Sequence, residues 1–355
     1  RRAYRRRQHD LKTVVHWGQR KLLLSEIEFF SLHSSGCTRV VYAGAAPGKH
    51  IPFLASLFPH LEFILVDPGE FTIQSCEAPK IEVRREFFTK ELAKQLGEET
   101  TASKTLFVSD IRTADAKVQS KEQVDAAVAK DMTMQQEWVR LLRPHRAMLK
   151  FRLPYASGQT EYLDGEMRLP IWAPITSTEA RLITDGAGTR AYDHTEYEEQ
   201  MFYFNTVTRV KRYRTPLVGE GLCESFDSAA EMQVLQEYLK GLDSGRLASL
   251  QETLGVCLEG GSAASTELVK ALFRRIGREC STRGRHLLTV LPTDAREKWF
   301  QAKVFDPETK KYFDACSQEG QDLLCAQSSS VATDMQASAR DVEMVWTAAS
   351  VGPRC

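Results

Sequence analysis

The stretch Val40-Val41-Tyr42-Ala43-Gly44-Ala45-Ala46-Pro47-Gly48-Lys49-His50, followed by Phe63-Ile64-Leu65-Val66-Asp67, decides the fold class of this chain. It reads as a buried strand, a tight glycine turn, a helix and a second strand that ends in an acid. The two glycines let backbone amides approach a ligand without interference from a Cβ atom, and a carboxylate about 20 residues later can bind a ribose diol. The pattern predicts a site for a nucleoside cofactor.

The spacing of the glycines narrows the choice of ligand. The turn from Gly44 to Gly48 differs from the Gly-x-Gly-x-x-Gly of dinucleotide-binding enzymes, and it lacks the Gly-Lys-Ser/Thr that cradles nucleotide triphosphates. A turn without charged side chains suits a ligand without phosphates, and S-adenosylmethionine is such a ligand. For the turn alone, an ordinary strand-to-helix connection that binds nothing is the alternative.

The composition indicates a globular protein. The chain has 355 residues, 42% of them hydrophobic, which is ample for a large core. No apolar run approaches the ~20 residues that cross a bilayer, and no apolar segment follows the basic start as in a secretion signal. The eight cysteines are scattered without a Cys-x-x-Cys pair or a nearby histidine, so we expect reduced structural thiols, no metal site and no membrane segment.

Basic residues are balanced overall but clustered locally. The chain has 47 basic and 47 acidic residues, yet residues 1–21 hold eight Arg or Lys against Asp10 alone, and a second cluster spans 209–214. Both clusters are candidates for phosphate contacts, and a solvated face or a nuclear import signal is the alternative for each. The basic start favours a nuclear protein, with the cytoplasm as the alternative.

Strand-like and helix-like segments alternate through the first half of the chain. A helix is expected from Gly18 to His33, where an apolar stripe is interrupted by Glu26 and Glu28. Strands are expected near 39–44, 62–67, 81–87, 105–110 and 146–153, and helices near 49–58, 89–96 and 122–142. This alternation predicts an α/β, Rossmann-like fold with a mostly parallel sheet and helices on both faces.

The second half is less regular. We expect strands near 168–172 and 179–184, a helix capped by Asp193 or Thr195, helices near 225–242 and 266–277, and a hairpin of Trp299–Val304 with Lys311–Phe313. Glu198, three residues after Thr195, could close a capping box. The simplest division is a catalytic domain, 1–280, with a basic segment at 1–17, and a carboxy-terminal extension, 281–355, that contains the hairpin and a flexible tail.

Four charged side chains stand out against apolar surroundings. Lys21 precedes three leucines, and Asp110 and Lys150 lie at or near the ends of expected strands, where ligands bind in sheets of this type. Glu179 opens a further strand. Each has a structural alternative, because Lys150 could extend its amine to solvent, Asp110 could cap a turn and Glu179 could pair with an arginine.

Taken together, the four residues resemble the Lys-Asp-Lys-Glu tetrad of ribose 2′-O-methyltransferases. The segments around them, 18–24, 42–51, 109–112 and 150–155, are similar to the cap-specific mRNA 2′-O-methyltransferase family of poxviruses and kinetoplastids, whose poxvirus members also stimulate poly(A) polymerase. The resemblance covers roughly residues 18–277. It implies that Lys150 is the general base, that Asp110 orients it beside the sulfonium, and that Lys21 and Glu179 complete the charge network.

The resemblance also implies binding residues. For S-adenosylmethionine the matching positions are Gln19, Tyr42, Gly44, Gly48, His50, Asp67, Phe87, Phe88 and Asp110. The family's arginine two residues after the ribose acid is Gly69 here. For an N7-methylguanine cap, Tyr155 matches an aromatic that stacks on the base and Glu198 matches a carboxylate that accepts its hydrogens, with Tyr4 as the opposing aromatic. The second family carboxylate is Ser157 here.

The leading hypothesis is S-adenosylmethionine-dependent methylation of the ribose 2′-hydroxyl of a cap-proximal nucleotide in m7G-capped RNA. Partners would be capped RNA and RNA-processing proteins, without a membrane or a metal. Two alternatives stay open: a 2′-O-methyltransferase that acts on internal or uncapped RNA, and a noncatalytic RNA-binding or processivity subunit.

Overall fold

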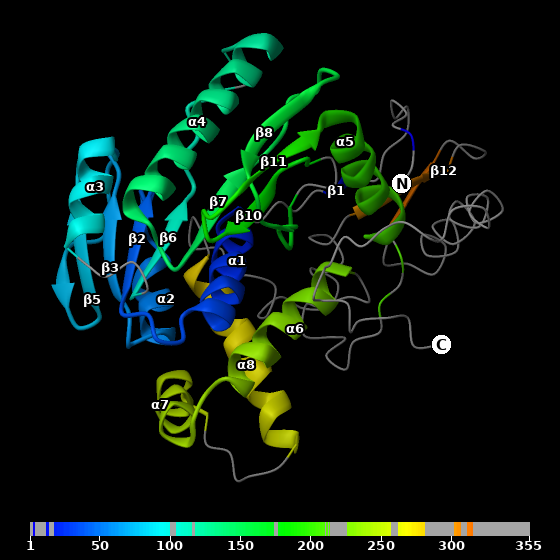
Figure 1. The fold of residues 1–355 in the computed structure, drawn as a ribbon. Helices are drawn as coiled ribbons and strands as arrows, with labels where there is room; N and C mark the ends of the chain where they lie inside the picture. The colour runs from blue at the N-terminus through cyan, green and yellow to red at the C-terminus, as the bar shows by residue number, and fades with distance from the viewer. Residues whose placement is uncertain are drawn as a thin grey trace. The chain divides into compact units, whose positions relative to one another are not determined.

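The computed structural model forms two compact units whose segments alternate along the chain (Figure 1). One unit comprises residues 25–170 and 178–198 and is called the sheet unit here; the other comprises residues 1–24, 171–177 and 199–355 and is called the helical unit. The structure describes residues 3, 12–13, 18–99, 104–115, 118–173, 177–209, 211, 213, 226–256, 262–280, 302–306 and 311–314.

The sheet unit is built on an eight-stranded sheet in the order β4-β5-β3-β2-β6-β7-β10-β9. Its parallel centre consists of β2 (Arg39–Ala43), β3 (Glu62–Val66), β5 (Lys80–Arg84), β6 (Thr105–Ser109) and β7 (Arg146–Phe151). The short β4 (Cys76–Glu77) pairs antiparallel with β5, and β10 (Ala180–Thr184) pairs antiparallel with both β7 and β9 (Glu166–Arg168). The predicted mostly parallel α/β sheet is confirmed.

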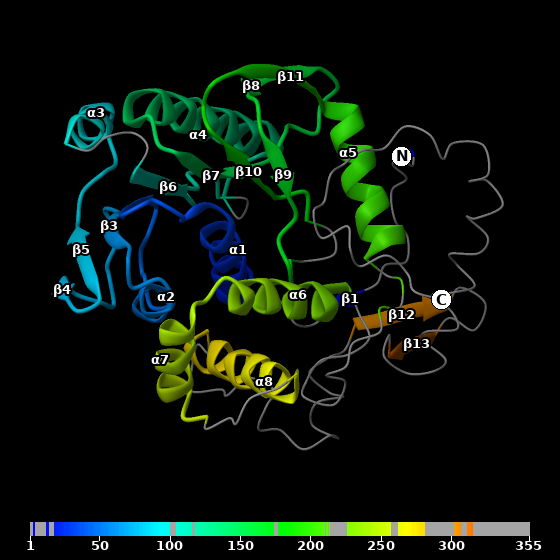
Figure 2. The same ribbon diagram turned by 60° about the horizontal axis from the view of Figure 1, so that its bottom comes forward.

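Helices cover both faces of this sheet, as expected. Figure 2 shows α3 (Lys90–Glu98) and α4 (Lys121–Leu142) on one side, and α2 (Ile51–Leu57) with α1 (Gly18–His33) on the other. Strands of a sheet covered on both faces read as continuous apolar runs, and every residue of β2 and of β6 is buried. The runs Val40-Val41-Tyr42 and Leu106-Phe107-Val108 therefore specify the central strands.

Local signals set the ends of the helices. Ser120 accepts a hydrogen bond from the Gln123 amide while the Gln123 side chain accepts one from the Ser120 amide, a capping box that starts α4. Thr89 accepts from the Leu92 amide at the start of α3. Pro52 lies in the first turn of α2, where its missing N–H is harmless.

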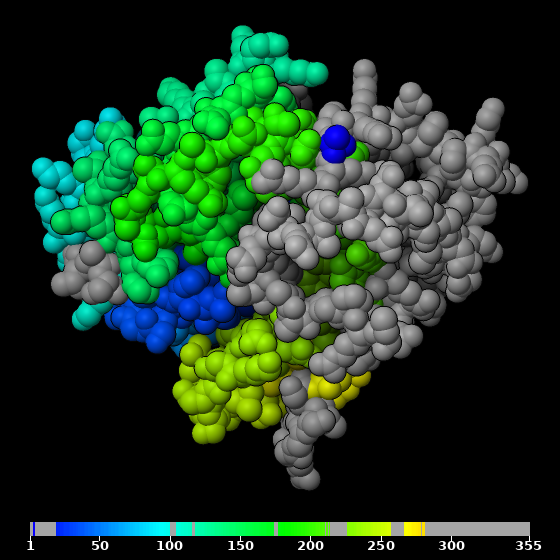
Figure 3. Space-filling model, turned by 45° about the vertical axis from the view of Figure 1, so that its right-hand side comes forward, coloured from blue at the N-terminus to red at the C-terminus, as the bar shows by residue number. Residues whose placement is uncertain are grey.

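The region after β7 differs from the prediction. The structure adds β8 (Gln159–Leu163) and β11 (Thr189–Asp193), an antiparallel pair that the sequence analysis missed, and β9 ends at Arg168 although a strand was expected over 168–172. In Figure 3 the teal-to-green part of the chain forms much of the surface of the face shown. α5 (His194–Tyr203) begins after Asp193, whose carboxylate accepts from the Glu196 amide, so Glu198 does not close a capping box.

The helical unit contains α6 (Phe226–Lys240), α7 (Ser244–Leu254) and α8 (Ser262–Glu279), and α7 was not predicted. The hairpin is confirmed, because β12 (Ala302–Asp306) pairs antiparallel with β13 (Lys311–Asp314); β12 also pairs with β1 (Lys12–Thr13). The buried Arg20 guanidinium binds Glu231, which also accepts from the indole of Trp172 at 2.6 Å. These contacts fix the first turn of α1.

One candidate phosphate contact is wrong. Arg209, which ends the π-helical turn Phe204–Thr208, is buried, and its guanidinium donates to both carboxylate oxygens of Asp227 at 2.8 and 2.9 Å. A guanidinium held in a bidentate pair inside the protein is a structural group and has no face for RNA. The expected flexible tail of the carboxy-terminal extension lies outside the described residues.

The glycine turn allows a clear stability test. Gly44 has φ +80°, and a Cβ there would lie 2.9 Å from the Ile111 amide nitrogen and 3.0 Å from the Asp110 carbonyl carbon, whereas at Gly36, with φ +74°, a Cβ would meet nothing within 4 Å. Both alanine variants lose the glycine conformation, at about 1 kcal/mol each, but only Gly44→Ala also displaces the backbone after β6. We expect Gly44→Ala to lower the free energy of unfolding by at least about 1 kcal/mol more than Gly36→Ala in urea titrations. Equal losses would contradict this packing.

Candidate functional site

The order of the strands places a ligand site beside Gly44. From β2 the chain moves to β3 and β5 on one side and then returns to β6 and β7 on the other, so the direction of winding reverses between β2 and β6. Ligands of open α/β sheets bind at the carboxyl ends of the strands at such a point. Here those ends carry Gly44 after β2 and Asp110 after β6, and the Asp110 amide donates to the Ala43 carbonyl at 3.0 Å.

Asp110 and Lys150 lie close together at this edge. The amine of Lys150, on β7, is 3.0 Å from Asp110 Oδ1, and both side chains are largely but not wholly buried. The predicted contact between these two residues is therefore present, and Lys150 does not extend to solvent. An amine anchored by a carboxylate at the edge of a sheet has a fixed direction, which a proton-transfer group requires.

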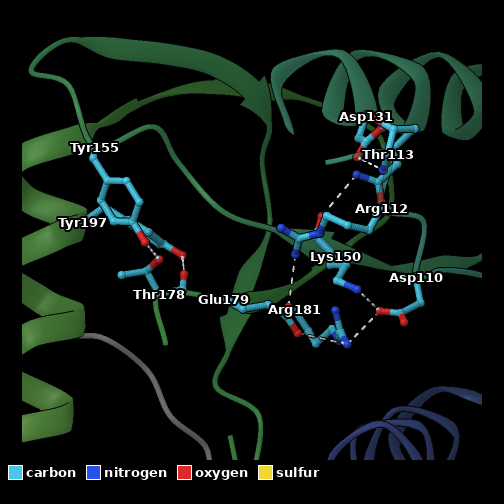
Figure 4. Close-up of polar contacts among 11 residues, drawn as sticks. Asp110, Arg112, Thr113, Asp131, Lys150, Tyr155, Thr178, Glu179, Arg181 and Tyr197 are labelled. Carbon is cyan, nitrogen blue, oxygen red and sulfur yellow. Dashed lines mark hydrogen bonds and ion pairs between the residues drawn. The ribbon is translucent and has the colours of Figure 1, made fainter. Parts of the chain in front are cut away.

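A third charged group, which the sequence analysis did not include in the site, joins this pair. Arg181 lies directly opposite Lys150 in the antiparallel pairing of β10 with β7, so the two side chains project from the same face of the sheet. Its guanidinium is 2.9 Å from Asp110 Oδ1 and 3.3 Å from Glu179 Oε1, and the side chain is 2% exposed (Figure 4). Burial lowers the pKa of Arg181, but the two carboxylates outweigh it, and the net pKa is raised.

Glu179 is the second carboxylate of the network that contacts two cations. Besides Arg181, it accepts a hydrogen bond at 3.1 Å from Arg112 Nη2, in the loop after β6 (Figure 4). The structural alternative for Glu179, pairing with an arginine, is thus confirmed twice, and it connects β10 to the loop that carries Asp110. The five charged groups of Asp110, Glu179, Lys150, Arg181 and Arg112 sum to one positive charge, which suits an anionic ligand or a developing oxyanion.

A buried polar cluster behind the glycine turn joins Glu26 on α1, Tyr42 on β2 and His50 at the start of α2. Glu26 on α1 is fully buried; it accepts a hydrogen bond from the Tyr42 hydroxyl at 2.7 Å, and its Oε2 is 2.8 Å from His50 Nε2. The Tyr42 hydroxyl and His50 Nε2 thus bind Glu26, and the expected contact of these two residues with a cofactor stays a prediction. Burial, together with the charge of Glu26, raises the pKa of Tyr42, so its hydroxyl stays a donor.

The other predicted cofactor positions gather at the ends of β2, β3 and β5. Asp67 accepts from the amides of Gly69 at 2.7 Å and Ala46 at 3.3 Å, which ties it to the glycine turn, and a carboxylate retains acceptor sites after two such bonds. Phe87 is 73% exposed. Phe88 is buried against Phe107 and Trp138 and thus has a packing role.

Tyr155 is an exposed aromatic held in one orientation. Its hydroxyl lies 3.1 Å from Thr178 Oγ1, the Arg152 guanidinium lies 4.7 Å from the ring centroid, and 51% of the side chain is exposed (Figure 4). Because Arg152 covers one face, a base can stack only on the other. Tyr197, which donates to the Thr178 carbonyl, lies beside it and precedes Glu198 on α5.

Three further predicted residues stay predictions. Gln19 and Lys21 lie in the first turns of α1, which belong to the helical unit, so their relation to Asp110, Lys150 and Glu179 stays a prediction. Tyr4 lies outside the described residues. Among the described residues, no group of His, Cys, Asp or Glu could hold a metal ion, and no helix is long and apolar enough to cross a membrane.

Comparison with known proteins places the chain in a family. Residues 2–238 match the family described as "Poly A polymerase regulatory subunit". The chain belongs to this family. Proteins named cap-specific mRNA (nucleoside-2′-O-)-methyltransferase are among its relatives. That of Myxoma virus (strain Lausanne) is 29% identical over 217 residues, which make up 56% of this chain and 63% of the relative. That of Fowlpox virus (strain NVSL) is 32% identical over 215 residues, which make up 55% of this chain and 68% of the relative. The chain therefore spans less than two thirds of the myxoma protein.

The protonation of His50 makes the stability of this member of the poly A polymerase regulatory subunit family depend on pH. Burial alone lowers the pKa of His50, but the charge and hydrogen bond of Glu26 outweigh it, so the net pKa is raised above 6.5. The pairing of His50 with Glu26 then stabilises the folded protein fully below pH 6.5, and this stabilisation is lost as the pH rises through the raised pKa of His50. We expect the difference in free energy of unfolding between the wild type and His50→Asn to shrink from about pH 6 to about pH 9. His60→Asn, at an exposed position, is the control; a difference that grows with pH would contradict the pairing.

Removal of Arg181 tests the buried network. Arg181→Met leaves two partly buried carboxylates close together without their shared cation, and breaking such a pair costs about 3 kcal/mol or more. Arg190→Met, which removes the exposed pair with Asp164, is the matched control and should cost less than about 1 kcal/mol. Urea titrations measure both, and similar losses for the two variants would show that Arg181 does not hold the network.

Proposed function

We propose that this protein transfers the methyl group of S-adenosylmethionine to the ribose 2′-hydroxyl of a cap-proximal nucleotide in m7G-capped RNA. The observation that carries the proposal is the convergence of Asp110, Lys150 and Arg181 at the carboxyl edge of the sheet, beside the glycine turn. The poxvirus relatives are named for this activity. The chain spans only part of them, so the activity, the substrate and the partners are proposed here.

The residues around the glycine turn fit S-adenosylmethionine. Asp67 is fixed at the end of β3 and retains acceptor sites for ribose hydroxyls, and Phe87, which follows the neighbouring strand β5, is open on its surface for an adenine. The turn itself has no charged side chain between Gly44 and Gly48, in keeping with a ligand that has no phosphate. When bound, this cofactor supplies an electrophilic methyl group.

The protein's own residues would then handle the proton and the charge. Lys150, in its neutral form, would accept the proton that the 2′-hydroxyl loses on methylation, while the electron pair of the broken carbon–sulfur bond would leave with the cofactor's sulfur. Asp110 would hold the amine in place for this proton transfer. As Lys150 takes up this proton, its network with Arg112, Arg181 and the two carboxylates gains one net positive charge, which stabilises the oxygen as it becomes negative. Lys21 completes the charge network in the proposal, and Tyr155 with Glu198 binds the cap, with Tyr4 opposite Tyr155. The nuclear location stays a prediction.

The base assignment is tested at Lys150. We expect Lys150→Ala and Lys150→Arg to abolish methyl transfer to a short capped RNA while the dissociation constant for S-adenosylmethionine changes little, because the amine acts on the acceptor oxygen. Lys130→Ala, which removes an exposed lysine on α4, is the control and should retain activity. Labelled-methyl incorporation and calorimetry give the two readouts. Full activity in Lys150→Ala would reject the assignment.

A competition experiment separates capped from uncapped substrates. If the cap is recognised, free cap analogue should inhibit methylation of a capped RNA, whereas an enzyme for internal or uncapped RNA should be unaffected. The family description favours one second function, that of a noncatalytic subunit in RNA processing. Cofactor binding without any methylated product on capped RNA would bring that function forward.

A further inference from the structure

α4 carries two buried polar side chains one helical turn apart, and each reaches a different part of the site. Asp131 is 4% exposed and Gln135 is 1% exposed, and a spacing of four residues puts them on the same face of the helix. Neither was noticed in the sequence, where they lie in a helix that is otherwise an ordinary mixture of apolar and charged residues.

Asp131 fixes the loop after β6. Its carboxylate accepts hydrogen bonds from the Thr113 amide at 2.9 Å and from the Thr113 hydroxyl at 2.7 Å (Figure 4). Thr113 follows Asp110 by three residues and is next to Arg112, so the same carboxylate restrains the segment that holds both charged groups. Within the described part of the chain, no cation pairs with Asp131. A buried carboxylate without a counterion is unfavourable, and an apolar side chain would pack α4 at lower cost.

Gln135 fixes the strand that carries the lysine. Its Nε2 donates to the backbone carbonyl of Lys150 at 3.1 Å. The Asp110 and Lys150 side chains meet at 3.0 Å, yet they come from the loop after β6 and from β7, and a side chain of α4 holds the backbone of each. One rigid helix of 22 residues therefore sets the position of both partners.

We propose that Asp131 and Gln135 are positioning residues that align the Asp110–Arg112 segment with Lys150 for methyl transfer. The inference rests on the proposed function for the reaction that these residues would support, whereas their contacts with the backbone do not depend on it. Neither side chain touches substrate, and both act through the backbone that they hold. A misplacement of about 1 Å in a reacting group lowers the rate about 100-fold, so loss of either contact should reduce kcat without weakening substrate binding.

The test compares three kinds of variant on the full chain. Asp131→Ala and Gln135→Met should each lower kcat for a capped RNA by about 10- to 100-fold, where kcat is the rate divided by the concentration of sites that bind the cofactor. KM for RNA should stay within about twofold of the wild type. Asp131→Asn keeps an acceptor for the Thr113 amide and a donor for its hydroxyl, so it should recover most of the rate. Val128→Ala, a buried apolar truncation on the same helix, controls for loss of stability.

Two readouts separate the possible failures. If Lys150→Ala is inactive but Asp131→Ala loses no more rate than Val128→Ala at the same thermal midpoint, the positioning role is overturned and the proposed function stands. If the wild type transfers no methyl group, the proposed function fails. Amide hydrogen exchange then still tests whether Asp131 and Gln135 hold their backbone segments in place. Faster exchange confined to residues 110–113 in Asp131→Ala and to 148–151 in Gln135→Met supports the role, and unchanged exchange there overturns it.

Discussion

The guanidinium of Arg181 lies between the carboxylates of Asp110 and Glu179 with almost no contact with solvent, and this burial constrains everything around it. A cation taken out of water is stable only if acids surround it closely, so the end of β6, the start of β10 and the loop that carries Arg112 must converge. Lys150, opposite Arg181 on β7, joins the same carboxylate. The charge network therefore holds a reactive amine at the sheet edge in one place.

The scaffold supports this convergence from three directions. Gly44 lets the end of β2 approach the Asp110 backbone more closely than any side chain would permit. Glu26 holds Tyr42 and His50 behind the glycine turn, and α4 restrains both the loop after β6 and the strand β7. The polar supports, Glu26, Asp131 and Gln135, are buried and make specific hydrogen bonds. Such groups stabilise a single arrangement at the expense of alternatives, as a site that aligns two reactants requires.

The sequence was sufficient for the parts of the fold that depend on local pattern. The apolar runs of β2, β3 and β6 and the glycine turn are local signals, and the structure follows them within a few residues. β8 and β11 were missed because neither is apolar enough to stand out, and their pairing joins residues about 30 apart. Arg181 was passed over because its role depends on acids from two other segments, although an arginine inside an apolar strand was a visible signal. Glu26, which interrupts the apolar stripe of α1, was a similar signal.

The most direct test of the central claim is to locate the transferred methyl group. The protein is incubated with a short m7G-capped RNA and S-adenosylmethionine that carries an isotopically labelled methyl group, and the digested RNA is analysed by mass spectrometry. The account predicts one labelled methyl on the ribose 2′-oxygen of a cap-proximal nucleotide, and none on the same RNA without a cap. A labelled methyl on a base, equal labelling of uncapped RNA, or no labelled product would contradict it.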